Sequence, residues 1–394
     1  LDTPSEADAF KKAIVEELGE KPEQVDKFFK KAAQLYNLTE PIFLRNSLHK
    51  LSTYLQPHTL KSFLKLHQLD VFRSMHQANA SLFQNPKTIQ LFDRYATYNG
   101  SNPYEAPATL NIISHLEHEI GAFFPKKGMY SITQCLVQLA EEMGVQFHYG
   151  QKVEEILLEG KAAVGIRVGN AEKYAALVVS NMDVANTYRR LLPEATHPKF
   201  TLSQPKSSSA LIFYWGVKKT FPNLDVHNIL FSEDYEREFK TLFEGRDIDH
   251  DPTVYIFASS KAVSGDAPEG CENWFVMINV PNDQGQDWDS LIARARENIL
   301  AKIQHQLGVD LREHIQCEDY LDPRRIESRT ASIGGALYGN SSNNKFAAFL
   351  RHPNFSRKIK NLYFCGGSVH PGGGIPLCLL SAKITAEVAE QHHA

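Results

Sequence analysis

The chain has 394 residues, a formal net charge of −4, and 42% hydrophobic and 22% charged residues. This composition is that of a globular protein of two or three domains. It excludes a disordered or fibrous chain, and the charge excludes a global basic field that would attract nucleic acid. The 5 cysteines are scattered without a C-x-x-C pair, which favours a reducing compartment over a disulfide framework. No apolar run approaches the ~18–20 residues that span a bilayer.

Residues 1–121 are expected to be helical. The segment Thr3-Pro4-Ser5-Glu6 has the form of a capping box, with Thr3 as the N-cap of a helix that ends at Gly19. Pro22 opens a second helix, whose apolar residues recur at helical spacing: Val25, Phe28, Phe29, Ala32, Leu35 and Tyr36.

The stretch 41–75 is leucine-rich and basic. Five of its side chains are cationic and face a single acid, Asp70; they are Arg45, Lys50, Lys61, Lys65 and Arg73. Two interpretations of this stretch remain open. It forms either a pair of surface helices packed on a core or a basic amphipathic surface that lies on a membrane.

Strands and helices alternate from residue 122 onward. The pattern predicts a helix at 131–143 that Gly144 ends, and a short strand at 145–147. Two further strands at 153–158 and 164–168 are separated by a turn signal. The continuous apolar run 176–179 predicts a buried strand, and a helix follows at 184–192.

The remaining elements divide into two blocks. In residues 201–345 the pattern predicts strands at 210–217, 254–258 and 274–280 and one strong helix at 291–307. Residues 346–394 return to a strand, a loop and a helix. The fold class is therefore expected to be mixed α/β and α+β, with one domain assembled from discontinuous segments.

The strongest local pattern is the glycine-rich loop 366–374, which follows an apolar strand and precedes a helix that starts near Pro376. Proline is tolerated in a first helical turn because its missing N–H would have no partner there. Glycine lets the backbone approach a ligand closely, and the free N–H groups of a helix start favour negative charge. A phosphate, or a ring that becomes anionic on reduction, suits this loop. A tight turn alone would not require 5 glycines in so short a loop.

Other chemistries have weaker support. No G-x-G-x-x-G motif is present, and the glycines with P-loop spacing lack the following Lys-Ser/Thr, which argues against ATP hydrolysis. Ser368 and His370 invite a hydrolase interpretation, but they lie two residues apart on a loop without a G-x-S-x-G elbow. The 16 histidines lack the spacing of metal ligands, so no metal site is expected.

The C-terminal run from Asn361 to Pro376 resembles the flavin motif of bacterial carotenoid desaturases of the phytoene desaturase type. The resemblance extends over essentially the whole chain. It includes a turn at 124–129, where Lys127 departs from the family's usual glycine, a middle flavin segment at 153–156 and 178–183, and a series of motifs in the substrate domain. Family members open with a βαβ unit that bears G-x-G-x-x-G, whereas this sequence starts at Leu1 without it. We therefore expect the chain to lack that N-terminal segment and, alone, to bind FAD weakly or not at all.

The resemblance implies an FAD-binding domain of the glutathione-reductase and amine-oxidase type. Residues 122–200 and 346–394 would supply its middle and C-terminal segments. Residues 201–345 would form a sheet-containing substrate domain, and residues 1–121 a helical region that faces substrate or membrane.

The resemblance also implies where the cofactor lies. The backbone at Val153 would meet the adenine end, and Ser180, Asn181 and Met182 would lie beside the cofactor. Gly367 and Ser368 would contact the ribityl–phosphate portion. Gly374, Ile375 and Pro376 would place the start of the helix against the flavin ring. No catalytic base can be assigned from the sequence.

The implied activity is desaturation of a carotenoid such as phytoene or a hydroxycarotenoid, by hydride transfer to the flavin. The protein would be cytoplasmic and would collect this substrate peripherally, at the inner face of the cell membrane. Two alternatives remain: a related flavoprotein of the retinol saturase or amine oxidase type, and a cofactor-free binding protein of the GDP-dissociation-inhibitor type.

Overall fold

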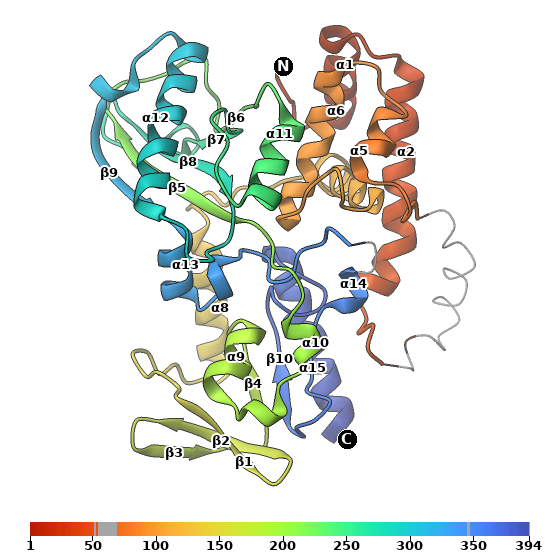
Figure 1. Ribbon diagram of the computed structural model, residues 1–394, viewed down its shortest axis with the longest axis vertical. Helices are drawn as coiled ribbons and strands as arrows, with labels where there is room; N and C mark the ends of the chain where they lie inside the picture. Colours follow the sequence, from red (N-terminus) through yellow and green to blue (C-terminus); the bar gives the residue numbers. More distant parts are fainter. Residues whose placement is uncertain (51–52, 54–68, 345–346, 394) are drawn as a thin grey trace. The chain divides into compact units, whose positions relative to one another are not determined.

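The computed structural model describes residues 1–50, 53, 69–344 and 347–393 (Figure 1). The chain forms two compact units. Unit 1 comprises Leu1–Ala122, Lys152–Ser208 and Glu327–Ala394, and unit 2 comprises Phe123–Gln151 and Ser209–Ile326. Each unit is built from segments that are distant in the sequence, so the predicted mixed fold with discontinuous segments is confirmed.

The first part of unit 1 is helical, as predicted. Helix α1 (Ala7–Leu18) is followed by α2 (Pro22–Thr39), which buries its predicted apolar stripe apart from the half-buried Tyr36. Shorter helical segments follow: Glu40–Leu44, α5 (Met75–Ala80), α6 (Pro86–Asp93), Arg94–Asn99, Ala108–Asn111, α7 (Ile112–His115) and Leu116–Ile120. Within the described part of the chain, no helix has the length and hydropathy needed to cross a bilayer.

The predicted capping box at the start of α1 is wrong. The helix begins at Ala7, and its N-cap is Glu6, which has an extended backbone (φ −71°, ψ 122°) and makes no side-chain cap bond. The first side chain of this helix that is buried is Phe10. No buried contact therefore draws residues 3–6 into the helix, and local capping preference alone does not do so. The predicted end is confirmed, because Gly19 adopts φ 70°.

The second part of unit 1 contains two small sheets. Strands β1 (Glu155–Glu159), β2 (Ala162–Val168) and β3 (Ala171–Tyr174) form an antiparallel meander. Strand β4 (Val178–Ser180) pairs in parallel with β10 (Leu362–Phe364), with Val178 opposite Leu362. The helices here are α9 (Val184–Leu191), Glu194–Thr196, α10 (Lys199–Leu202), Ile333–Gly335, α14 (Ala347–Leu350) and α15 (Ile375–His393).

Two predicted strands differ from the structure. Residues 145–147 form no strand, because no other strand pairs with them within the described chain; Phe147 instead stacks on Tyr149 at 5.8 Å between ring centroids. The apolar run at 176–179 does form β4, but Val179 is 46% exposed rather than buried. A two-stranded sheet can cover only part of such a strand.

Unit 2 is dominated by an antiparallel five-stranded sheet in the order β6-β7-β8-β5-β9. Its strands are β5 (Ser209–Val217), β6 (His227–Leu230), β7 (Val254–Phe257), β8 (Glu272–Val280) and β9 (Ile315–Leu321). Side chains of β8 alternate between buried and half-buried along its whole length. The long helix α12 (Trp288–Leu307) packs its buried residues on one face of the sheet, which matches the elements predicted there (Figure 1).

The other elements of unit 2 are α8 (Tyr130–Glu142), α11 (Tyr235–Lys240), Thr241–Gly245, Ser259–Lys261 and Leu311–Glu313, and α13 (Pro323–Thr330) leads back into unit 1. Helix α8 buries none of its residues, and Leu136 and Leu139 are about half exposed.

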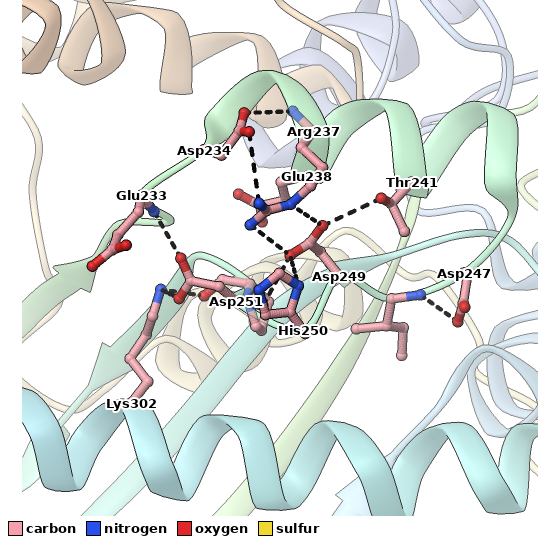
Figure 2. A network of polar contacts seen from close by, with 12 residues as sticks. Glu233, Asp234, Arg237, Glu238, Thr241, Asp247, Asp249, His250, Asp251 and Lys302 are labelled. Atoms are coloured by element: carbon pink, nitrogen blue, oxygen red, sulfur yellow. Dashed lines mark hydrogen bonds and ion pairs between the residues drawn. The ribbon is translucent and has the colours of Figure 1, made fainter.

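A dense polar network ties α11 to the segment that precedes β7 (Figure 2). Asp249 accepts hydrogen bonds from Arg237 and Thr241, and Lys302 of α12 pairs with Asp251 at 2.7 Å. Both carboxylate oxygens of Glu238, which is 5% exposed, accept hydrogen bonds from Thr253. These bonds compensate for the burial of the charged groups that hold this corner of the sheet.

Candidate functional site

The parallel pairing of β4 with β10 brings two distant segments together. Both strands end at the same edge, so Ser180, Asn181 and Met182 lie beside the start of the glycine-rich loop. The side-chain nitrogen of Asn181 donates to the carbonyl of Cys365 at 3.2 Å. A Cβ at Gly366 would lie 2.7 Å from that nitrogen, and φ there is +105°, so only glycine fits at this contact.

Two hydroxyl groups of the predicted site hold the scaffold. Ser180 is buried, and its hydroxyl bonds to that of Thr187 at 2.8 Å. The Ser368 hydroxyl accepts a hydrogen bond from the backbone N–H of Val184 at 2.9 Å and so satisfies one free donor at the start of α9. The loop is therefore fixed to α9, and Ser368 is not presented as a nucleophile.

The loop also packs closely against the segment 338–340. A Cβ at Gly339 would lie 2.7 Å from the Cα of Ser368, and one at Gly373 would lie 2.7 Å from the ring of Tyr338. Such distances leave no room for side chains. Gly373 of the loop and Gly339 of the opposing segment are thus needed to let two stretches of backbone touch.

The end of the loop differs, because it is open. Gly374 has φ +98°, and nothing lies within 4 Å of the position that a Cβ would take. Gly374, Ile375 and Pro376 are all exposed, and Ile375 is 52% exposed despite being apolar. The start of the 19-residue helix α15 therefore presents free N–H groups and an apolar first turn to its surroundings.

Eight of the nine predicted contact residues belong to these two connected segments. Val153, the ninth, is half-buried two residues before β1 and is connected to the same unit through the β1–β2–β3 sheet. The core cluster that contains Ile156 of β1 also contains Phe364 of β10, so one packed core underlies both sheets.

A buried arginine, which sequence reasoning missed, lies under the loop. The Arg351 side chain donates to the carbonyls of Tyr338 (2.9 Å), Gly367 (3.3 Å) and Asn340 (3.2 Å). Burial lowers the pKa of Arg351 to about 10, so it stays charged at neutral pH.

The histidine of the loop behaves differently. His370 is 1% exposed, and its Nε2 donates to the carbonyl of Asn46 at 2.9 Å. Burial lowers the pKa of His370 to about 4, so this ring is neutral at pH 7.

Arg351, by contrast, could not be distinguished from a surface arginine in the sequence, because its partners are backbone carbonyls.

Comparison with known proteins identifies the family of this chain. The family model described as flavin containing amine oxidoreductase matches residues 6–389. The chain is 49% identical over 394 residues to a 1-hydroxycarotenoid 3,4-desaturase of Flavobacterium sp. (strain P99-3), and it covers 80% of that protein. It is 32% identical over 311 residues to a 4,4'-diapolycopene oxygenase of Methylomonas sp, of which it covers 62%.

Solved structures show the same fold. An oxidoreductase from Methanosarcina mazei matches with a TM-score of 0.56 at 17% identity, over 84% of this chain and 72% of that one. A putrescine oxidase matches with a TM-score of 0.57 at 12% identity, over 94% and 76%.

The described residues fit the cofactor of this family, which is FAD. The open, left-handed Gly374 leaves space for a flat ring, and the exposed apolar turn at Ile375 offers it a surface. The N–H groups of the helix start and the buried charge of Arg351 favour a ring that becomes negative on reduction. The predicted resemblance to bacterial carotenoid desaturases is confirmed, and the chain belongs to the flavin-containing amine oxidoreductase family.

Proposed function

We propose that this protein desaturates a carotenoid, with a hydroxycarotenoid as the favoured substrate. The observation that carries the proposal is the 49% identity to the 1-hydroxycarotenoid 3,4-desaturase, which extends over all 394 residues. The open edge at β4, β10 and α15 supports it, since the reaction needs a flavin and an apolar approach to it. In this proposal residues 122–200 and 346–394 belong to the FAD domain, 201–345 to the substrate domain, and 1–121 to a helical region facing substrate or membrane.

When bound, FAD would supply a hydride acceptor, and loss of a proton from the neighbouring carbon would complete the new double bond. The residues of this chain provide position and charge. We assign Gly374, Ile375 and Pro376 to the ring, Gly367 and Ser368 to the ribityl–phosphate portion, and Ser180 to Met182 to the side of the cofactor. Val153 is assigned to the adenine end. At Ser368 the backbone is the expected contact, because its hydroxyl already accepts a bond from Val184.

The second face of the unit 2 sheet is a suitable surface for a polyene. It carries a row of aromatic rings that α12 does not cover. The ring centroids of Tyr214 and Phe275 lie 5.7 Å apart, and those of Phe275 and Tyr255 lie 6.3 Å apart. Phe124 and Phe257 continue the row at 5.7 Å. Tyr214 is 40% exposed. Flat, half-exposed rings bury apolar surface with little loss of conformational entropy, which suits a rigid conjugated chain.

Product analysis tests the function. The protein is supplied with FAD and incubated with a 1-hydroxycarotenoid, with phytoene and with a primary amine, and bound flavin and the masses of the products are measured. Loss of two hydrogens from the hydroxycarotenoid supports the proposal. Gain of oxygen would favour an oxygenase, gain of two hydrogens a saturase, and turnover of the amine alone an amine oxidase. A protein that holds no flavin and changes none of the three would be a binding protein.

We also propose that the protein associates peripherally with the inner face of the cell membrane, where an apolar substrate is collected. The basic stretch 41–75 supports this in part. Within it, Arg45 pairs with Glu40, Arg73 pairs with Asp70, and Lys50 donates to Gln391. Lys61 and Lys65 lie outside the described residues.

Liposome flotation distinguishes the two interpretations of this stretch. Each cation near an anionic surface contributes about 1 kcal/mol, so Lys61→Glu/Lys65→Glu should reduce binding to anionic vesicles at least tenfold. The matched control, Lys21→Glu/Lys30→Glu, makes the same charge change at exposed positions of unit 1. Equal binding by the two double variants would favour surface helices packed on a core.

A further inference from the structure

Arg351 holds two stretches of backbone together from below the glycine loop. Its Nη1 donates to the carbonyls of Tyr338 and Gly367, and its Nη2 donates to that of Asn340. The guanidinium also packs closely against the loop, because a Cβ at Gly372 would be 3.3 Å from its Cζ. One side chain thus contacts both the glycine loop and the segment 338–340.

In the part of the chain that the structure describes, the charge of Arg351 has no acidic partner. The side chain is 4% exposed, and no carboxylate lies within ion-pair distance of it among the described residues. The residues outside the description, 51–52, 54–68, 345–346 and 394, contain no Asp or Glu side chain. A buried cation is normally paired, because leaving it alone costs several kcal/mol. The backbone carbonyls offset that cost only in part, so the positive charge remains available to a neighbour.

Lys206, a basic residue close to Arg351, does have an acidic neighbour. Lys206 donates to the side chain of Asn340 at 2.7 Å, so it is close to the same backbone segment. It interacts electrostatically with Asp183, which balances it. The histidine of the loop is neutral at pH 7, as described above. Of these three groups, Arg351 is therefore the one that is charged and lacks an acidic partner among the described residues.

We propose that Arg351 is a positioning residue for the bound flavin, which fixes the glycine loop and whose unpaired charge favours the reduced, anionic form of the ring. This rests on the proposed placement of the flavin against the loop. A buried charge acts through a medium of low polarity, so its field is screened far less than that of a surface arginine. Retaining an unpaired cation is costly for folding, and stabilising the charge that reduction creates gives that cost a function.

The reduction potential of the bound flavin tests the proposal directly. In the FAD-loaded protein, Arg351→Met should shift the equilibrium toward oxidised flavin at least tenfold, which is about 30 mV for a two-electron couple. Arg351→Lys keeps the charge and should keep the potential, although it makes fewer bonds and should hold flavin more weakly. Arg357→Met removes an exposed arginine of the same segment and should leave the potential unchanged.

A second pair of variants covers the case in which Arg351→Met does not fold or load. The thiol of Cys378 on α15 is near enough to interact electrostatically with Arg351. Cys378→Asp places a carboxylate there and pairs the charge without removing the guanidinium, so it should lower the potential as Arg351→Met does. Cys378→Ser is its control for shape and should leave the potential unchanged.

The outcomes separate this inference from the proposed site. The role of the charge is overturned if the flavin of loaded Arg351→Met keeps the wild-type potential. It is also overturned if Cys378→Asp and Cys378→Ser have the same potential. The same conclusion follows if the potential of the flavin in Arg351→Lys is as low as that in Arg351→Met. If Gly374→Ala weakens flavin binding while the potentials stay unchanged, only the inference about Arg351 fails. If Gly374→Ala also leaves flavin binding unchanged, the placement of the flavin at this loop fails.

Discussion

The sheet of unit 2 and the β4–β10 pair of unit 1 are built for different tasks. In the sheet, five strands pair in the order β6-β7-β8-β5-β9, and α12 covers one face, so that β8 buries every second side chain completely or nearly so. In the pair, two three-residue strands meet, Val179 is 46% exposed, and the helix that follows β10 begins with an exposed apolar turn. The apolar surface is closed in the sheet, where it stabilises the fold, and is left open beside the β4–β10 pair, where we propose that the flavin binds.

The largest effect on stability is expected from the closed region. Phe213 is 1% exposed in the core beneath α12. Phe213→Ala should cost about 3–5 kcal/mol, because it leaves a cavity in a packed core. The flavin affinity of the protein that remains folded should not change. Denaturant unfolding and flavin titration measure the two quantities.

The neighbouring residue provides the control. Tyr214 lies on the opposite face of the same strand and is 40% exposed. Tyr214→Ala should destabilise the protein less and should instead raise the KM for the polyene. If Tyr214→Ala proves the more destabilising of the two changes, the assignment of the faces is wrong.

The next effect concerns the open region. Gly374→Ala should lower desaturation roughly 100-fold, because displacing the flavin by about 1 Å disrupts the alignment that hydride transfer needs. Flavin affinity should fall with it, as titration would show. Gly265→Ala is a matched control, since Gly265 has φ +97° and also has nothing within 4 Å. Gly265→Ala introduces the same backbone strain at a position outside the candidate site. If both variants lose flavin binding equally, strain alone explains the effect.

The closed unit also contains a pH-dependent contact. Burial raises the pKa of Glu238 to about 7, while Lys302 opposes this shift and Asp249 adds to it. Between about pH 4.5, where the unfolded carboxyl loses its proton, and pH 7, the folded protein keeps a proton that the unfolded chain releases. Stability should therefore fall as the pH rises through this window.

Glu238→Gln removes that titration and retains the contact with Thr253. The variant should gain on the order of 2 kcal/mol relative to the wild type between pH 4.5 and pH 7.5. Thermal unfolding across this range measures the gain, and Glu236→Gln, at an exposed position of the same helix, should leave the fall in place. If the stability of Glu238→Gln falls with rising pH as steeply as that of the wild type, Glu238 is not the source of the pH dependence.

The smallest effect is expected at Ser368. Ser368→Ala removes the acceptor for the N–H of Val184 and should cost about 1 kcal/mol of stability. Desaturation should decline only mildly, far less than in Gly374→Ala. An inactive Ser368→Ala variant beside an active Gly374→Ala variant would instead restore the hydrolase interpretation.

How much could be predicted from the sequence differs between the two regions. The strands at 210–217 and 274–280 and the helix at 291–307 follow from apolar periodicity, because a closed core imposes that periodicity on its residues. The strand β3, which is exposed throughout, has no such pattern and could not be predicted. The failed strand at 145–147 shows the converse: a suitable sequence forms no strand where no partner pairs with it.

The candidate site was predictable where glycine marks it. Gly374 combines a left-handed backbone with open space, and Gly366 closely approaches Asn181; both constraints require this residue type and so are visible in the sequence. Arg351 was not predictable, because its importance comes from its burial and from the absence of an acidic partner among the described residues. Those are properties of its surroundings and not of its own residue type.

The pairing of β4 with β10 also determines when the site can form during synthesis. The partners Val178 and Leu362 are separated by 184 residues, and the whole sheet of unit 2 lies between them in the sequence. At about 5–20 residues per second, a ribosome needs roughly 10–40 seconds to make that stretch. During this time the sheet can fold while β4 still waits for its partner. The candidate site can therefore assemble only after the sheet has been made, and a ribosome-bound chain stopped before residue 362 should contain a folded sheet without the β4–β10 pair.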